Sequence, residues 1–320
     1  MRIPQTLNMP PANNLPARLT ARLAPDALTI FLFHGVINGY NSAVRNYTGK
    51  HINADLFARS MKQLAATGHP ISMNAVVEHI DLQEEFPPRA FAVTFDDGFE
   101  NNLSVAAPIL ADLQIPVMIY LTTQFIETNR MSWIDRIEAA VDQAEAQSIT
   151  AWSGASFEIS DTASRIRFLK AVRTRVKNDP AADADAFATE VCTSLRVQEH
   201  MSSNSPLDLK MTWAQVREAN ESALITFGGH SHTHPILSFL APDGLVAEIE
   251  TSLSLLDTYA GIGPTHYSYP EGLSHCYSDA VIRELRRHGV RCCPTAIDGT
   301  NHATSDLFHL RRVMVDAATA

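Results

Sequence analysis

Ala90-Phe91-Ala92-Val93-Thr94-Phe95-Asp96-Asp97-Gly98 is the stretch of sequence that decides the fold. A short apolar run that stops at a turn signal is typical of a strand buried on both faces of a parallel sheet. Two adjacent carboxylates follow this run directly. Because a buried carboxylate is costly unless it meets a partner or a metal, we expect Asp96 and Asp97 to lie at the end of the strand and to take part in chemistry.

A second motif, His230-Ser231-His232-Thr233-His234-Pro235, follows another apolar run at residues 223–227. His230 and His234 are four residues apart, and on a helical turn this spacing brings both rings to one side, within reach of one ion. The two motifs together offer a divalent metal two imidazoles and one carboxylate, with one carboxylate left over. This is the ligand count of a catalytic metal site, which keeps a position open for water.

The rest of the chain alternates short apolar runs with helical patterns. One helix is predicted over residues 54–67, with Asn53 as its N-cap and Gly68 as its end. Near-continuous apolar strands separated by helices predict a parallel sheet covered on both faces, or a closed barrel. The other predicted strands are 28–33, 91–95, 116–121, 224–227, 267–269, 290–293 and 310–315, and the other predicted helices are 101–113, 245–259 and 278–288.

One segment breaks this alternation. From residue 122 to residue 209 the apolar spacing predicts helices only, in three amphipathic stripes, with a polar return loop at 201–206. We therefore predict one catalytic domain over residues 1–320 with a helical insertion after its third strand. Two interpretations of the insertion stay open: a cap without a role in the reaction, or a lid or wall of the substrate groove.

Bulk composition limits the classes of partner. The 320 residues carry a formal net charge of −10, which argues against nucleic acid and anionic membrane surfaces as partners. Four cysteines without a CxxC spacing indicate no disulfide framework. Residues 1–25 lack the apolar stretch of a signal peptide, and no run of 18 apolar residues occurs. We expect a cytoplasmic protein without a membrane span; the composition says nothing of its oligomeric state.

The combination of TFDDG at 94–98 and HSxxHP at 230–235, in this order, resembles the polysaccharide deacetylase family (NodB-like, carbohydrate esterase family four). The likeness extends to Phe33-His34-Gly35-Val36 and to Tyr267-Ser268-Tyr269-Pro270-Glu271-Gly272. It implies a deformed barrel of the (β/α)7 type. It also implies a hydrolase that uses a divalent metal, often zinc, to remove N- or O-acetyl groups from sugars.

Carried over residue by residue, the resemblance makes Asp97, His230 and His234 the metal ligands and Asp96 the general base. The physical chemistry agrees with this division, because a carboxylate bound to a metal has committed its lone pairs while its neighbour can still take a proton. One divalent ion is expected, and zinc is the family's usual choice. The same oxygen and nitrogen donors also accept cobalt, nickel, manganese or iron.

The chain departs from the family pattern at the group that braces the base. Many members carry an arginine at the position of Ser268. We expect Arg312, or its neighbour Arg311, to supply this charge from the last strand.

The remaining site residues also follow from the resemblance. Leu307-Phe308-His309 matches the family's LxH motif, which makes His309 the candidate general acid. His34, Tyr269, Pro270 and Glu271 are the candidate substrate-binding residues, and a backbone N–H near Pro270 and Glu271 would stabilise the oxyanion.

The leading prediction is a hydrolase that removes an N-acetyl group from an acetamido sugar. The sugar could belong to a polysaccharide, an oligosaccharide or a carrier-linked substrate. Two alternatives stay open: the same machinery acting on another amide, such as a cyclic amide or a formamide, and a non-catalytic carbohydrate-binding relative.

Overall fold

The computed structural model of the protein describes residues 14–40, 42, 44–150 and 154–316. Residues 1–13, which include half of the segment inspected for a signal peptide, lie outside the described part. No helix within it is both long and apolar enough to cross a membrane.

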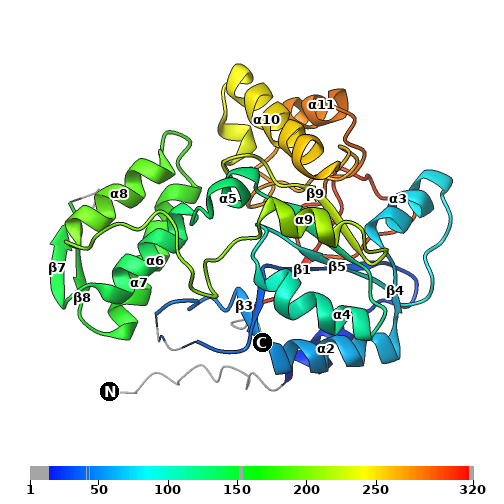
Figure 1. The fold of residues 1–320 in the computed structure, drawn as a ribbon, viewed down its shortest axis with the longest axis horizontal. Helices are drawn as coiled ribbons and strands as arrows, with labels where there is room; N and C mark the ends of the chain where they lie inside the picture. Colours follow the sequence, from blue (N-terminus) through cyan, green and yellow to red (C-terminus); the bar gives the residue numbers. More distant parts are fainter. Residues whose placement is uncertain (1–13, 41, 43, 151–153, 317–320) are drawn as a thin grey trace, which may run out of the picture.

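A parallel sheet forms the centre of the molecule (Figure 1). Its strands run in the order β10-β1-β5-β6-β9, and the two-residue strand β4 pairs with the first residues of β5. Every residue of β1, β5 and β6 is buried, as expected of strands covered on both faces. The bounds are β1 (Thr29–Phe33), β4 (His69–Pro70), β5 (Ala90–Phe95), β6 (Val117–Leu121), β9 (Ile225–Gly229) and β10 (Val313–Met314).

Backbone hydrogen bonds continue the sheet from β9 around to β10. Parallel bridges join Gly229 to Tyr267 and His266 to Cys292, and further bonds link residues 293–297 to residues 307–312, just before β10. Seven parallel segments therefore follow one another around a ring among the described residues. The prediction of a deformed (β/α)7-type barrel is confirmed.

The deformation lies in the last three segments. The predicted strands at 267–269 and 290–293 are single bridges, and the strand predicted at 310–315 is reduced to the two residues of β10. Pro270 and Pro294 follow the first two segments directly, and a proline has no N–H to extend a ladder.

Helices cover the outside of the barrel. The helix predicted at 54–67 is α2 (Ala54–Thr67), capped by Asn53 and ended by Gly68 as expected. The helix predicted at 101–113 is a π-helix, η2 (Asn102–Ala106), followed by α4 (Ala107–Asp112); Pro108 cannot donate the bond of a regular α-turn there. The other elements around the barrel are α1 (Leu15–Thr20), β2 (Gly35–Ile37), β3 (His51–Asn53), α3 (Met73–Leu82), α9 (Trp213–Ala219), η3 (Leu237–Phe239), α10 (Pro242–Ala260) and α11 (Asp279–Arg287).

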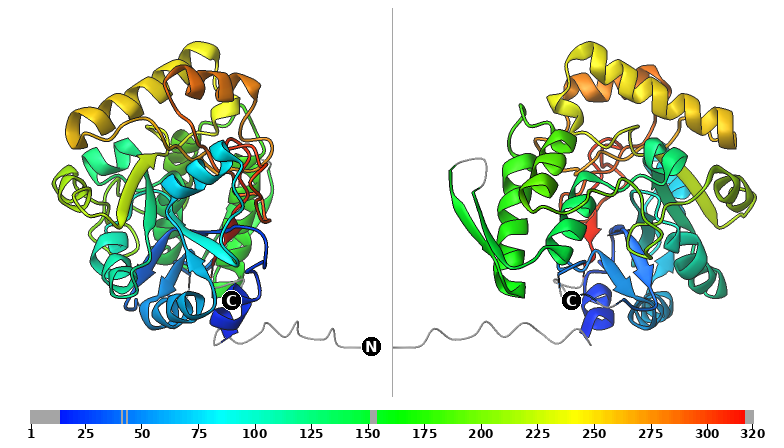
Figure 2. Two further views of the ribbon diagram at one scale, coloured as in Figure 1. Left: turned by 90° about the vertical axis from the view of Figure 1, so that its right-hand side faces the viewer. Right: turned by 60° about the vertical axis from the view of Figure 1, so that its left-hand side comes forward.

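The segment between β6 and β9 forms a lobe beside the barrel, drawn in green in Figures 1 and 2. Its helices are α5 (Thr123–Thr128), α6 (Trp133–Gln143), α7 (Thr162–Lys177) and α8 (Ala184–Ser194). The prediction of helices only was wrong at one place, where β7 (Gln147–Thr150) and β8 (Ser156–Ile159) form an antiparallel hairpin. Ile149 and Ile159 face the lobe's own core, but four-residue strands carry too little alternation to be recognised.

The lobe has a hydrophobic core separate from that of the barrel, centred on α6, α7 and α8. Polar contacts join the two parts. Lys50 of the barrel pairs with Asp135 of α6 at 2.5 Å, and Lys177 at the end of α7 pairs with Glu271. The second pair reaches the loop that carries the third family motif, so the lobe abuts the carboxyl ends of the strands.

Substitution of Asn53 tests whether its side chain stabilises the N-terminus of α2. The Asn53 side chain accepts hydrogen bonds from the N–H groups of Asp55 and Leu56 at 3.0 and 3.3 Å. We expect Asn53→Ala to lower the free energy of unfolding by about 1 kcal/mol in urea denaturation. Asn53→Asp keeps an acceptor and should stay near the wild type; equal losses in both variants would contradict the capping role.

Candidate active site

The first motif turns sharply as it leaves β5. The Asp96 N–H donates to Phe33 O at 3.1 Å, which continues the pairing with β1. Asp97 and Gly98 both have left-handed backbones, with φ of 75° and 78°. The turn places both carboxylates in the same cavity at the carboxyl end of the sheet, with different partners.

Asp96 is held by a two-pronged ion pair from the last strand. Arg312 Nη1 and Nη2 donate to Asp96 Oδ1 and Oδ2 at 2.8 and 2.9 Å. Nη2 also donates to Ser268 Oγ at 2.8 Å, so the hydroxyl that replaces the family's arginine is bonded to an arginine from elsewhere in the chain. Burial opposes ionisation of Asp96, but the Arg312 guanidinium outweighs it and lowers the pKa of this carboxyl. Asp96 therefore stays a carboxylate.

The second motif leaves β9 as a loop, and the helical turn expected around its histidines was wrong. Ser231 and His234 both have left-handed φ values of 65°, which no α-helix contains. The Ser231 side chain accepts the His234 N–H at 2.9 Å and holds this turn. His232 points elsewhere, to Thr123 Oγ1 at 2.8 Å. The two outer histidines still face each other, with ring centroids 5.0 Å apart.

Asp97, His230 and His234 converge as a possible metal centre. Asp97 Oδ1 lies 3.7 Å from His230 Nε2 and 3.4 Å from His234 Nε2, and the ligand atoms of all three lie within 4.8 Å of one another. His230 Nδ1 donates to the Ser268 carbonyl at 2.9 Å, which leaves the Nε2 lone pair toward the centre.

The donor set fits a divalent metal on two further observations. Asp97 Oδ1 is buried and has no hydrogen-bond partner in the described chain, as expected of an atom that awaits a cation. Burial opposes ionisation of Asp97, yet the adjoining imidazoles hold the pKa of its carboxyl well below the usual range. Two imidazoles and a carboxylate are also a ligand set that zinc and its neighbours accept.

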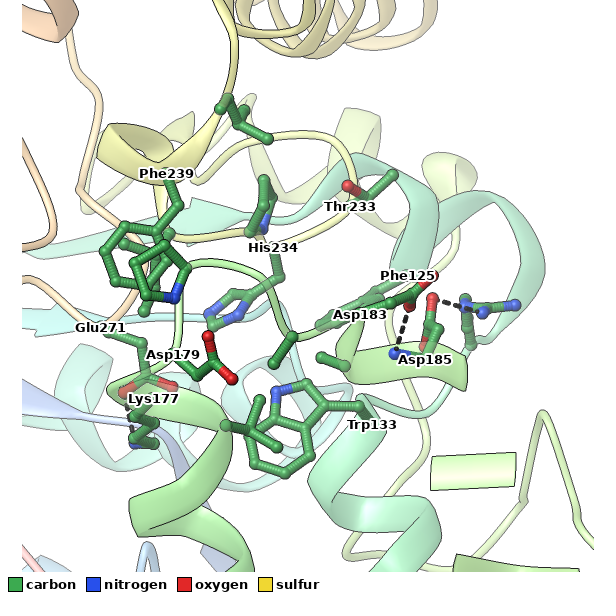
Figure 3. Close-up of a pocket in the computed structure, with 18 of the residues that line it drawn as sticks. Phe125, Trp133, Lys177, Asp179, Asp183, Asp185, Thr233, His234, Phe239 and Glu271 are labelled. Carbon is green, nitrogen blue, oxygen red and sulfur yellow. Dashed lines mark hydrogen bonds and ion pairs between the residues drawn. The ribbon is translucent and has the colours of Figure 1, made fainter. Parts of the chain in front are cut away.

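A cavity of about 200 Å³ opens over these residues. Asp96, Asp97, His230 and His234 line its barrel side, and Ser132, Trp133, Ile134, Arg173 and Lys177 from the lobe form the opposite wall. Of the two interpretations of the insertion, the structure therefore favours a wall of the groove. A second cavity of about 270 Å³ adjoins the first and shares Trp133, Lys177, His234 and Glu271 with it (Figure 3).

The remaining predicted residues divide into two groups. His34 lines the first cavity, and burial lowers the pKa of its imidazole against the pull of Asp97 and Asp96. Glu271 lines both cavities and is paired with Lys177; although burial raises the pKa of its carboxyl, Lys177 outweighs this effect and brings it to about 2.

Tyr269, Pro270 and His309 line neither cavity. Tyr269 is fully buried, stacks on Tyr277 and donates to the Phe308 carbonyl at 3.2 Å. His309 is half-exposed, with Nδ1 3.1 Å from the Asp306 carboxylate. The structure thus does not bring His309 to the metal centre, because the LxH match lies before Arg312 on the same segment and faces away.

Sequence reasoning missed the basic residues that the lobe contributes to the cavity wall. Arg173 and Lys177 lie on one amphipathic helix, where charged residues usually form a solvated face. Only the packing of α7 against the barrel, which the helical pattern does not encode, distinguishes them from the other basic residues of this helix.

Comparisons with known proteins give one sequence family and several solved structures of similar fold. The sequence model of the polysaccharide deacetylase family matches residues 181–293, which contain the histidine motif. A search of curated protein sequences gives no significant match.

Solved structures show the same fold. The deacetylase PplD of Streptococcus pyogenes, in complex with acetate, is 16% identical with a TM-score of 0.58 over 92% of this chain and 94% of its own. IcaB from Ammonifex degensii is 16% identical with a TM-score of 0.59 over 93% of this chain and 100% of its own. A de-N-acetylase from Aggregatibacter actinomycetemcomitans is 16% identical with a TM-score of 0.59, over 92% and 97%.

The buried ion pair between Arg312 and Asp96 makes a prediction for stability. We expect Arg312→Met to lower the free energy of unfolding by about 3–5 kcal/mol, because it leaves a buried carboxylate without its counter-charge. Adding Asp96→Asn removes that charge, so the double variant should recover part of the loss. Urea denaturation in the presence of a chelator measures both; additive losses would contradict direct coupling.

Proposed function

Because the chain belongs to the polysaccharide deacetylase (NodB-like) family, we propose that it is a metal-dependent hydrolase that removes the N-acetyl group from an acetamido sugar. The observation that carries this proposal is the convergence of Asp97, His230 and His234 within 4.8 Å, in one cavity with the braced carboxylate of Asp96. One divalent ion, for which zinc is the expected identity, would be held by these three side chains.

When bound, such an ion would lower the pKa of water and polarise the carbonyl of the substrate. The rings of His230 and His234 are held in place by neighbouring groups of the protein. The Ser268 carbonyl fixes the His230 ring, and Phe125 stacks against His234 with centroids 6.0 Å apart. Orientation of ligand rings by such contacts is what gives metal sites their rigidity.

Asp96 would act as the general base. Its Oδ2 lies 3.8 Å from His230 Nε2, so a proton acceptor stands beside the ligand atoms without being one of them. Arg312 keeps the carboxylate ionised and fixes its plane through two hydrogen bonds. The carboxylate can then take a proton from the water that attacks the amide carbonyl.

His34 is the imidazole best placed to return a proton to the leaving nitrogen. It lies on the wall of the cavity that contains Asp96 and Asp97, whereas His309 lies outside it. Its position follows β1 directly, at the same edge of the sheet as the carboxylates. We assign the proton-donor role to His34 in place of His309. Because burial lowers the pKa of this imidazole against the effect of Asp97 and Asp96, His34 would carry the donated proton only after receiving it from Asp96 within the reaction cycle.

The backbone N–H of Glu271 is the candidate donor to the developing oxyanion. Glu271 has a left-handed backbone, with φ of 61°, and lies at the boundary of both cavities. Within the described residues no group accepts a hydrogen bond from this amide. An unused N–H at such a place is what stabilisation of a tetrahedral intermediate requires.

Ligand and base variants should separate metal binding from turnover. We expect Asp97→Ala or His230→Ala to lose both bound metal and acetate release, since each removes a ligand. Asp96→Asn should keep the metal and lose about 10²- to 10⁴-fold in kcat. Elemental analysis and an acetate assay on N-acetylglucosamine oligomers measure the two effects; an Asp96→Asn enzyme with unimpaired turnover would refute the base assignment.

Two histidine variants test the proton donor. We expect His34→Gln to lower kcat by about 10²-fold or more with metal content unchanged, because a general acid is lost. His309→Gln is the matched control and should keep the wild-type rate. The reverse pattern would return the role to His309. Measuring formate beside acetate in the same assays tests the alternative that the substrate is another amide.

A further inference from the structure

We propose that Lys177 of the lobe is a positioning residue for the amide of Glu271, so that the insertion takes part in the reaction as well as forming a wall of the groove. This inference rests on the proposed function, because it concerns the step in which negative charge develops on the substrate carbonyl. Lys177 ends α7, whereas Glu271 belongs to the loop that carries the third family motif. The two residues lie 94 positions apart in the sequence and meet because the lobe packs against the barrel.

Two contacts from the end of α7 hold this loop. The Lys177 ammonium donates to the Glu271 carboxylate as an ion pair, which Figure 3 marks with a dashed line. The Lys177 carbonyl also accepts a hydrogen bond from His275 Nε2 at 3.3 Å. The side chains of the ion pair are 29% and 20% exposed, so water screens it only in part. One residue of the lobe thus contacts the loop through both its side chain and its backbone.

The loop needs such support because its backbone is strained. Glu271 and Gly272 have left-handed φ values of 61° and 60°, and this conformation is unfavourable for a glutamate. The Gly272 N–H donates to the Pro270 carbonyl at 2.7 Å, and the Gly272 carbonyl accepts the Ala296 N–H at 2.8 Å. These bonds fix the backbone on either side of the Glu271 residue, and the ion pair with Lys177 fixes its side chain.

The charge of Glu271 gives the ion pair a second effect. This side chain lines the cavity of the metal centre, where the oxyanion would form. A carboxylate there opposes the negative charge on the substrate oxygen, although the amide of the same residue would stabilise it. The Lys177 ammonium offsets this opposition and leaves the amide in place. Arg173, one turn earlier on α7, is paired with Glu138 at 2.9 Å instead.

Removing the two charges singly and together separates the charge effect from simple anchoring. We compare kcat and KM of the metal-loaded full chain for acetate release from N-acetylglucosamine oligomers. Lys177→Met should lower kcat roughly 10- to 100-fold and change KM much less, because the loss falls on the transition state. Glu271→Gln keeps the amide and removes the opposing charge, so its kcat should stay within about threefold of the wild-type value. The double variant should recover most of the loss, and Lys177→Arg should keep the wild-type rate.

Lys170→Met is the matched control. Lys170 is exposed on the same helix and lines neither cavity, so this variant should leave kcat and KM unchanged. Thermal unfolding checks that each variant is folded, and Lys177→Gln takes the place of Lys177→Met if the latter does not fold. Equal losses in Lys177→Met, Glu271→Gln and the double variant would reduce the pair to an anchor and overturn the proposal.

Binding of acetate to the metal-loaded chain, measured by calorimetry, reports the same charges without turnover. Lys177→Met should weaken this binding about tenfold, and adding Glu271→Gln should restore it. This pattern in a chain that releases no acetate from any acetamido sugar would keep Lys177 as the residue that favours negative charge beside Glu271, and would remove the proposed function. Turnover or acetate binding that Lys177→Met leaves at the wild-type value would overturn the inference.

Discussion

Two adjacent carboxylates are buried at the end of one strand, and each needs positively polarised groups around it to offset the cost of burying its charge. The two carboxylates are stabilised by different groups. Asp96 receives a guanidinium through two hydrogen bonds. Asp97 instead turns Oδ1 toward two imidazoles, and this oxygen accepts no hydrogen bond from the described residues. The left-handed turn at Asp97 allows neighbours in sequence to have such different surroundings. The division of labour between a base and a ligand follows from this asymmetry.

Much of the barrel could be predicted because its signals are local. The apolar run before Asp96, the cap at Asn53 and the stop at Gly68 each act within a few residues, and the structure has these elements where the sequence places them. The meeting of Asp97 with His230 and His234 was also predictable, because parallel strands present their carboxyl ends at one edge. The helical turn around the histidines was wrong, since their spacing fits a loop with two left-handed residues as well as a helix.

Features that depend on packing between distant segments could not be predicted. Nothing in the periodicity of α7 distinguishes Lys177, which faces the site, from the basic residues of the same helix that face solvent. The hairpin at β7 and β8 was too short to recognise. His309 fitted a motif of two positions, but its segment turns that side chain away from the barrel mouth, whereas Arg312, three residues later, reaches the centre. Ser268 stands where many members of the family carry an arginine. In this chain Arg312 supplies the positive charge beside Asp96 from a different segment.

The position of Arg312 near the end of the chain affects the order in which the site can form during synthesis. Arg312 lies 216 residues after the carboxylate it neutralises. During synthesis the ribosome releases β5 long before it releases β10, so for most of that time the acidic pair has no guanidinium to pair with. The early barrel strands therefore lack the counter-charge of Asp96 until the final segment is released. Because domains generally fold as units, we expect the barrel to close around Asp96 late in synthesis.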